Sequence, residues 1–338
     1  MNLQLPNNDI YFDENYLKIY ENIGEGKLYF FNFEMAGLKA IYPFLVNSVN
    51  SLGYKLQSEF YDIQGAYGYN GVLTNSYDKS FISAFYVSFE EYCAKNNIIA
   101  EFTRFHPLLR NHQFSEKHME ITFDRNTVAL DLRKSYEDIW TNDYTSNNRN
   151  KIRKAHKFGY SCDIIQEPSL SLINKFIMIY YGNMVKVKAD DYYFFKRDYF
   201  INLFSNLKKY IYLLNVRNKD GRIQCSSIFF HYGPYFHYHL SGRKEETDNS
   251  ITNFILDEAV RLAITKGGKY FHFGGGRTGD ENDSLLKFKG NFSKMRLPFY
   301  IGKRIYNKEI YNNVIRQWKI KYPEKIQKYG NRVLMYRY

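Results

Sequence analysis

Apolar and polar residues alternate in a way that predicts one structural plan twice along the chain. Residues 27–46 are typical of two strands joined by a turn at Ala36-Gly37. A helix at about 78–96 and a short apolar strand at 98–105 follow them. Hairpin, helix and strand therefore succeed one another within the first 105 residues.

The same succession returns about 170 to 180 residues later. Residues 210–230 form a clearer hairpin, because Asp220-Gly221 is a favoured turn pair. A strand at 235–242, a helix at about 250–266 and a strand at 269–276 complete the second copy.

A basic segment, residues 145–160, separates the two copies and predicts a helix capped by Asn147 or Asn148, with its basic side chains facing outward. We also expect a helix near 168–183, a strand beyond Pro298 and a basic helix at about 308–321. No heptad run is long enough for a coiled-coil arm.

This order predicts an α/β (α+β) protein of two similar domains, residues 1–150 and 151–338, each a mixed, mostly antiparallel sheet flanked by helices. A length of 338 residues agrees with two domains. No apolar run is long enough to span a membrane, and the N-terminus shows no secretory signal. The spacing of the three cysteines favours a reducing cytoplasm over a disulfide framework or a zinc site.

Charge is distributed unevenly. Residues 1–148 carry 12 basic and 19 acidic side chains, residues 149–286 carry 21 and 14, and residues 287–338 carry 14 and 2. A basic second half suits a polyanionic partner, such as nucleic acid, a nucleotide diphosphate or an anionic membrane surface. The alternative is a solvated basic tail that keeps a tyrosine-rich protein soluble.

Four strings, in this order, resemble the Fem family of peptidoglycan bridge-forming aminoacyltransferases, and more broadly the Fem-like GNAT acyltransferases encoded with capsule and O-antigen genes. They are YDIQGAYGYNG (61–71), RFHP (104–107), NRNKIRKAHKFGY (148–160), and FHFGGG (271–276) with SLLKFKGNFSK (284–294). The resemblance implies two GNAT-like domains in tandem. It also implies transfer of an acyl or aminoacyl group to an amine on a nucleotide- or lipid-linked precursor, or on a cell-wall peptide.

The resemblance also implies site residues. The family's catalytic lysine falls on Lys289, and its acidic acceptor-side residue falls on His106, where a histidine replaces the aspartate. Acceptor binding is expected in the first domain and donor binding in the second. The acceptor candidates are Lys18, Tyr67, Tyr69, Arg104 and Lys188. The donor candidates are Tyr238, Ser241, Arg243, Gly274, Gly275, Gly276 and Arg277.

The residue types fit this chemistry. A histidine can accept the amine's proton at neutral pH, and a lysine can stabilise the oxyanion if both face one cleft. Neither side chain is expected in the core. The three consecutive glycines let backbone approach a ligand, or simply form a turn. YGYNG (67–71) either stacks a uracil or sugar ring or is a packed loop. His237 and His239 share a strand face and are interpreted as polar core groups, so no metal site is predicted.

The co-substrate is expected to be acyl-coenzyme A or aminoacyl-tRNA, with no tightly bound cofactor. Residues 241–253 lack the glycines with which GNAT proteins hold the coenzyme A pyrophosphate. The alternatives to an enzyme are a non-catalytic RNA- or tRNA-binding module and a membrane-surface scaffold. The expected location is the cytoplasm, free or peripheral at the inner face of the membrane.

Overall fold

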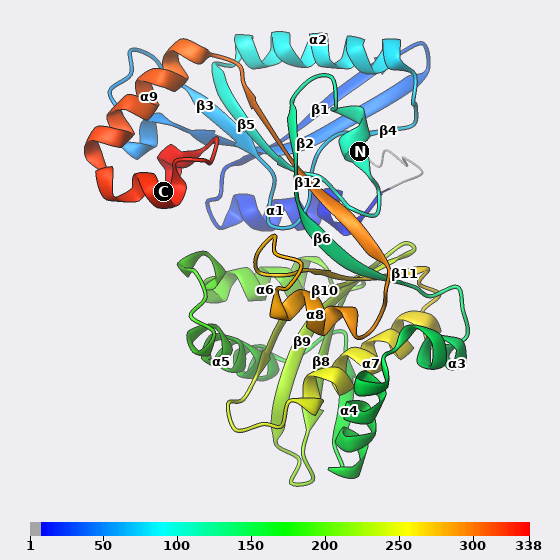
Figure 1. Ribbon diagram of the computed structural model, residues 1–338. Helices are drawn as coiled ribbons and strands as arrows, with labels where there is room; N and C mark the ends of the chain where they lie inside the picture. The colour runs from blue at the N-terminus through cyan, green and yellow to red at the C-terminus, as the bar shows by residue number, and fades with distance from the viewer. Residues whose placement is uncertain (1–7) are drawn as a thin grey trace. The chain divides into compact units, whose positions relative to one another are not determined.

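The computed structural model describes residues 8–338, which form two compact units (Figure 1). Unit 1 contains the chain up to Asp124 together with Pro298–Tyr338, and unit 2 is Arg125–Leu297. Residues 1–7, on which the expectation of no secretory signal partly rests, lie outside the described residues.

Unit 1 is built on a five-stranded sheet of order β1-β2-β3-β5-β12, with β4 paired to β2. Its strands are β1 (Lys27–Met35), β2 (Leu38–Ser48), β3 (Tyr61–Gln64), β4 (Leu73–Thr74), β5 (Ile98–Arg104) and most of β12 (Arg296–Ile305). Its helical elements are η1 (Ile10–Phe12), α1 (Glu14–Asn22), η2 (Asn50–Leu52), α2 (Lys79–Lys95), η3 (Asn111–Phe114), α9 (Lys308–Lys321), η6 (Pro323–Lys325), α10 (Ile326–Tyr329) and η7 (Met335–Arg337).

Unit 2 has a six-stranded sheet of order β6-β11-β10-β9-β8-β7. Its strands are most of β6 (Glu120–Asp131), β7 (Ser161–Ile165), β8 (Ile211–Arg217), β9 (Ile223–Tyr232), β10 (Tyr235–Arg243) and β11 (Tyr270–Gly275). Its helical elements are α3 (Tyr136–Asp138), η4 (Ile139–Asp143), α4 (Ser146–Lys157), α5 (Leu170–Lys186), η5 (Asp191–Tyr193), α6 (Arg197–Asn206), α7 (Ser250–Thr265) and α8 (Ser284–Gly290).

The two sheets repeat one plan, as the sequence pattern predicts. In unit 1, three antiparallel strands lead through α2 to β5, which runs parallel to β3. In unit 2, β8, β9 and β10 lead through α7 to β11, which runs parallel to β10. On its other side, β5 pairs with the antiparallel strand β12, and β11 likewise pairs with the antiparallel strand β6. The fold class of two similar domains, each a mixed, mostly antiparallel sheet flanked by helices, is thus confirmed.

The strands β12 and β6 explain why the units divide the chain differently from the predicted domains 1–150 and 151–338. Residues 301–305 of β12 pair with β5 of unit 1, and α9 buries Trp318 in a core with Ile99. Residues 127–131 of β6 pair with β11 of unit 2. Pairing between segments so far apart in the sequence leaves no local pattern.

Helices cover both faces of each sheet. In unit 1, Phe85 and Phe89 of α2 pack on Phe31 of β1, and Ile98 of β5 belongs to the same core. The next residue of β5, Ile99, points to the opposite face, which α9 covers. In unit 2, α4 and α7 line one side of the strands, whereas α5 and α6 lie on the other (Figure 1).

Most predicted helices and strands are confirmed to within two or three residues, but the basic helix α4 departs from the expectation. Its N-cap is Thr145, whose hydroxyl accepts a hydrogen bond from the backbone of Asn148. Asn148 itself is buried. Arg149 does not face outward freely, because its guanidinium donates to three carbonyl groups of the segment before the helix.

None of the helices in residues 8–338 is both long and apolar enough to cross a membrane. The three cysteines are free thiols.

Candidate functional site

Lys289 is enclosed by backbone and side chains of unit 2. It is on α8, and only 7 % of its surface is exposed. Its Nζ donates a hydrogen bond of 2.7 Å to the carbonyl oxygen of Gly275, the last residue of β11. The Nζ also lies 5.9 Å from the ring centroid of Tyr238. The expectation that Lys289 stays outside the core is therefore wrong.

The glycines at the end of β11 make the room for this lysine. Gly274 has a φ of +79°, and a Cβ there would lie 3.2 Å from the Lys289 Nζ. A Cβ on Gly276 would overlap the carboxylate of Asp283, at 2.6 Å. The close approach that Gly274 and Gly276 permit is thus used by this chain's own lysine and aspartate.

Asp283 fixes the start of α8 and, with it, the position of Lys289. One of its oxygens accepts hydrogen bonds from the backbone of Leu285 and Leu286, and the other accepts from Arg277 and Thr278. An aspartate at an N-cap satisfies amide groups that the helix leaves without partners. Asp283 therefore has a structural role in the acidic segment 280–283.

The electrostatics of Lys289 set it apart from the surface lysines. Burial is the main reason that the pKa of its ammonium falls to about 7. The Asp283 carboxylate opposes this fall, and the Arg125 guanidinium adds to it. Arg125 is held in place by donating to the Gly276 carbonyl at 2.9 Å. Near neutral pH, Lys289 can thus exist in either protonation state.

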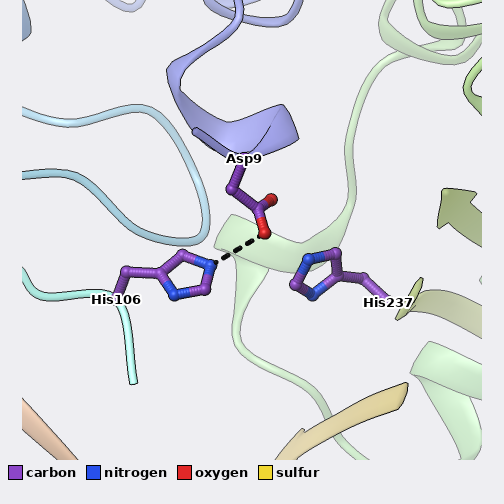
Figure 2. Close-up of side chains that lie close together, drawn as sticks. All are labelled: Asp9, His106 and His237. Atoms are coloured by element: carbon purple, nitrogen blue, oxygen red, sulfur yellow. Dashed lines mark ion pairs between the residues drawn. The ribbon is translucent and has the colours of Figure 1, made fainter. Parts of the chain in front are cut away.

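His106 is the corresponding buried group of unit 1, directly after β5. Its side chain is fully buried, again contrary to expectation. Its Nδ1 accepts a hydrogen bond from the Leu109 backbone at 3.2 Å, and its Nε2 lies 3.2 Å from an oxygen of Asp9 (Figure 2). Because Nδ1 accepts, we assign the ring proton to Nε2, the nitrogen that faces the Asp9 carboxylate. The pair brings a carboxylate to a position where the resemblance implied one and the sequence shows a histidine.

The YGYNG loop is packed into unit 1. Arg104 donates to the carbonyl groups of Gly65, Ala66 and Gly68, so its guanidinium holds the loop in shape. Tyr69 contacts the His106 ring edge-on, with centroids 5.0 Å apart. This favours the packed-loop interpretation, with Tyr69 lying against the buried pair.

The Tyr67 carbonyl accepts a hydrogen bond from the Tyr16 hydroxyl at 2.6 Å. Lys18 is exposed on α1 and pairs with Glu14 at 2.7 Å, one helical turn away. Lys188 is exposed just after α5, with a φ of +49°. Lys18 and Lys188 belong to different units, and neither contacts the buried groups of its own unit.

The donor candidates lie on β10 and beside β11. Tyr238 stacks on Phe229, and the hydroxyl groups of Ser241 and Ser227 lie 2.6 Å apart. Arg243, at the end of β10, donates to the Thr247 carbonyl at 2.7 Å. Arg277 is exposed beyond the glycines. The structure thus joins Tyr238, Gly274 and Gly275 to Lys289, while Ser241 and Arg243 lie further along β10.

His237 and His239 are largely enclosed in unit 2, consistent with polar core groups. The Nε2 of His239 lies 2.8 Å from the Tyr199 hydroxyl. Burial lowers the pKa of His239 to about 3, so its ring is neutral at physiological pH. His237 faces the His272 ring, with centroids 5.7 Å apart.

Sequence reasoning missed three residues that shape the two sites: Asp9, Arg125 and Asp283. For Asp283, the run Asp-Ser-Leu-Leu carries an N-cap signal that could have found it. Asp9 stands almost a hundred residues before His106, and no local pattern links them. Arg125 lies in the middle of β6, where a basic residue has no distinctive spacing.

Several solved structures are similar to this chain. FemX is 13 % identical, with a TM-score of 0.68 over 91 % of this chain and 95 % of that chain. The chain shares the fold of FemX. L-PGS from Bacillus licheniformis is also 13 % identical, with a TM-score of 0.55 over 86 % and 92 % of the two chains.

A third similar structure is the C-terminal domain (DUF2156) of an Agrobacterium fabrum protein described as a lysylphosphatidylglycerol synthetase. It is 12 % identical, with a TM-score of 0.53 over 88 % of this chain and 89 % of that one. No protein-family model and no curated protein sequence matches the chain. At these identities, the likeness to FemX establishes the fold and leaves the reaction to be argued from the residues.

Proposed function

We propose that the protein transfers an acyl or aminoacyl group to an amino group of a cell-envelope precursor, either a nucleotide- or lipid-linked amino sugar or a cell-wall peptide. The observation that carries this proposal is Lys289. It is buried against the glycines of β11, at the position where the Fem resemblance implies the catalytic lysine. The shared fold with FemX supports the same assignment.

Lys289 is assigned to the donor. Attack of an amine on an ester or thioester carbonyl develops negative charge on the carbonyl oxygen. An ammonium held in a site that largely excludes water stabilises this charge more strongly than one in bulk solvent. With a pKa of about 7, Lys289 is charged below that pH and loses its proton above it.

The Asp9–His106 pair is assigned to the acceptor. As the new C–N bond forms and the C–O or C–S bond to the donor breaks, the amine must lose a proton. The proton ends on the departing oxygen or sulfur. A carboxylate fixed by an imidazole is suited to accept it in transit. The Leu109 backbone fixes the imidazole through Nδ1, and Nε2 lies 3.2 Å from the Asp9 carboxylate, so His106 and Asp9 are proposed to act as a unit.

The donor is proposed to be aminoacyl-tRNA or acyl-coenzyme A, with aminoacyl-tRNA at least as well supported. Arg153, Lys154 and Lys157 of α4 are exposed and offer a basic surface to a polyanion. Residues 244–249 lead into α7 without the glycines that cradle a pyrophosphate. The protein would work in the cytoplasm or at the inner face of the membrane.

A transfer assay tests the proposal. Purified protein is incubated with labelled acetyl-coenzyme A or aminoacyl-tRNA and with a panel of nucleotide- and lipid-linked amino sugars and wall peptides. We expect at least one labelled N-acyl product, formed about 10²–10³-fold more slowly by Lys289→Met. Lys287→Met is the matched control, because Lys287 is exposed on the same helix. RNA binding without a product from any pair would favour the non-catalytic RNA-binding module instead.

A further inference from the structure

Unit 2 contains a cavity of about 600 Å³ whose lining includes neither Lys289 nor any donor candidate except Arg243. It lies between α5, the turn that joins β8 to β9, and the end of β10. Six basic side chains and one acidic side chain line it: Lys175, Lys186, Arg217, Arg222, Arg243, Lys244 and Glu245. The excess of positive charge indicates an anionic occupant.

Two of these cations are held in place before any ligand arrives. Arg217 is paired with Asp163 at 2.5 Å and donates to the Gly221 carbonyl at 2.7 Å. Arg243 donates to the Thr247 carbonyl. A guanidinium fixed in this way loses little side-chain freedom when it binds a phosphate group. The side chains of Lys175, Arg222 and Lys244 are exposed around the opening and can close on the same group.

The apolar part of the lining is aliphatic. Met178, Ile179 and Ile223 line the cavity, and the lining includes no aromatic ring. In a chain with 33 Tyr and 28 Phe, this favours an alkyl or glycerol group over a nucleobase, which proteins commonly stack on aromatic rings.

Gly182 provides room in the cavity wall. It lies within α5, where glycine is one of the least favourable residues. A Cβ on Gly182 would meet nothing within 4 Å, so packing does not require a glycine there. Gly242 on β10 is the contrast, because a Cβ there would lie 2.7 Å from the backbone of Ile179 and Tyr180. Gly242 lets α5 lie close to the sheet, whereas Gly182 leaves space open beside the cations.

The outer surface of α5 continues the apolar character of the cavity. Leu170, Met178 and Val185 are 52, 74 and 67 % exposed. Their spacing of eight and seven residues places them within about 80° of one another around the helix. Met178 belongs both to this strip and to the cavity lining. Exposed aliphatic side chains beside a cluster of cations complement a bilayer whose surface is anionic.

We propose that this face of unit 2, the cationic cavity together with the aliphatic strip of α5, docks the protein on an anionic membrane. In this arrangement the cavity holds the phosphate of a lipid headgroup, and Leu170, Met178 and Val185 enter the interface. The assignment does not depend on the proposed transfer reaction, because docking is measured without donor or acceptor.

Sedimentation with vesicles tests this assignment. The full-length protein is mixed with vesicles of 30 % phosphatidylglycerol in phosphatidylcholine, and with vesicles of phosphatidylcholine alone. We expect binding to the anionic vesicles only. The double variant Arg222→Gln/Lys244→Gln and the single variant Met178→Ser should each weaken binding at least tenfold. Gly182→Leu, which fills the cavity, should do the same with an unchanged or higher melting temperature.

A matched control separates the cavity from general charge. Ile320 on α9 is 82 % exposed and stands between Lys319 and Lys321, outside the cavity lining. Lys319→Gln/Lys321→Gln removes the same charge as the cavity double variant, and Ile320→Ser removes an equally exposed aliphatic group. Both should keep near wild-type binding. Equal losses in control and cavity variants would overturn the proposal in favour of attraction by net charge.

Soluble competitors identify the source of the phosphate. Inorganic pyrophosphate, a nucleoside diphosphate and tRNA are titrated calorimetrically into wild type and Gly182→Leu. Membrane docking would be overturned by two results together. One is tight binding of a soluble phosphate that Gly182→Leu abolishes, and the other is the absence of binding to the anionic vesicles. Vesicle binding that depends on the cavity and far exceeds the affinity for the soluble phosphates supports it.

Discussion

Unit 1 and unit 2 both bury ionisable side chains, but the buried Lys289 of unit 2 has a different kind of partner from the buried carboxylates of unit 1. In unit 1 the buried carboxylate of Asp62 accepts from the Tyr336 hydroxyl and from Arg337 at 2.8 Å, and Asp9 faces His106. In unit 2 the hydrogen bond of buried Lys289 goes to a carbonyl oxygen.

The difference separates structural from chemical uses of buried charge. Asp62 ties the C-terminal segment to β3, because both its partners lie within the last three residues of the chain. Lys289 keeps a pKa of about 7, and a group with such a perturbed pKa in a glycine-lined site is a candidate for catalysis. Asp9 is buried beside a basic partner, as the structural Asp62 is. The Asp9–His106 pair nevertheless stands where the resemblance implies a functional residue, so an experiment has to decide between the two roles.

The Asp9–His106 pair gives the largest expected effect. Asp9→Asn keeps the side-chain volume and removes the proton acceptor, so turnover should fall about 10²–10⁴-fold. His106→Ala should lower turnover similarly and also lower the free energy of unfolding by about 3 kcal/mol, because it leaves a buried carboxylate without its imidazole. Initial rates and urea unfolding measure the two effects.

Glu14→Gln, in the exposed pair with Lys18, is the control for this experiment and should change neither rate nor stability. If Asp9→Asn turned over its substrate at the wild-type rate, the pair would be structural, like that of Asp62.

Lys289→Met should lower activity without lowering stability, unlike His106→Ala, which should lower both. Transfer should fall about 10²–10³-fold, since the group that stabilises the oxyanion is lost. The melting temperature should stay unchanged or rise, because methionine fills a similar volume without a buried charge. A marked fall in melting temperature, with transfer reduced only in proportion to folded protein, would place Lys289 with the structural charges.

Asp62→Ala should affect stability alone. It leaves the Arg337 guanidinium without its carboxylate, and we expect the free energy of unfolding to fall by about 3 kcal/mol. This is the lower end of the range for buried pairs, since 17 % of the Arg337 side chain is exposed. Activity per folded molecule should be unchanged. Chemical unfolding measures the loss of stability, and active-site titration measures the activity per folded molecule. A lower activity per folded molecule would contradict a purely structural role for Asp62.

The pH dependence should be the mildest effect and carries a definite sign. The folded pKa of Lys289 is about 7 and the unfolded value is about 10.5, so the unfolded chain binds more protons between these values. Stability should therefore rise with pH across this window, by about 2 to 3 kcal/mol between pH 7.5 and 9.5. Transfer should fall over the same window as the ammonium loses its proton. Unfolding at both pH values, compared with Lys289→Met, isolates the contribution of this lysine.

Local structure was readable from the sequence because its causes are local. The alternation of residues 27–46, the turn pair Asp220-Gly221 and the apolar face of residues 250–266 each determine a strand, a turn or a helix from neighbouring residues. The helix predicted at 308–321 is α9 with the same bounds. These local patterns together predicted the repeat of hairpin, helix and strand, and the repeat predicted two similar domains.

The tertiary structure alone decided which distant segments meet. That β12 returns to unit 1 depends on hydrogen bonds between strands almost 200 residues apart, and the sequence does not mark this pairing. The same holds for Asp9 beside His106. The sequence marked Lys289 through its resemblance to the Fem string, but gave no sign of its burial. Only the packing of α8 against the β11 glycines removes it from water, and that loss of hydration is the physical reason for its lowered pKa.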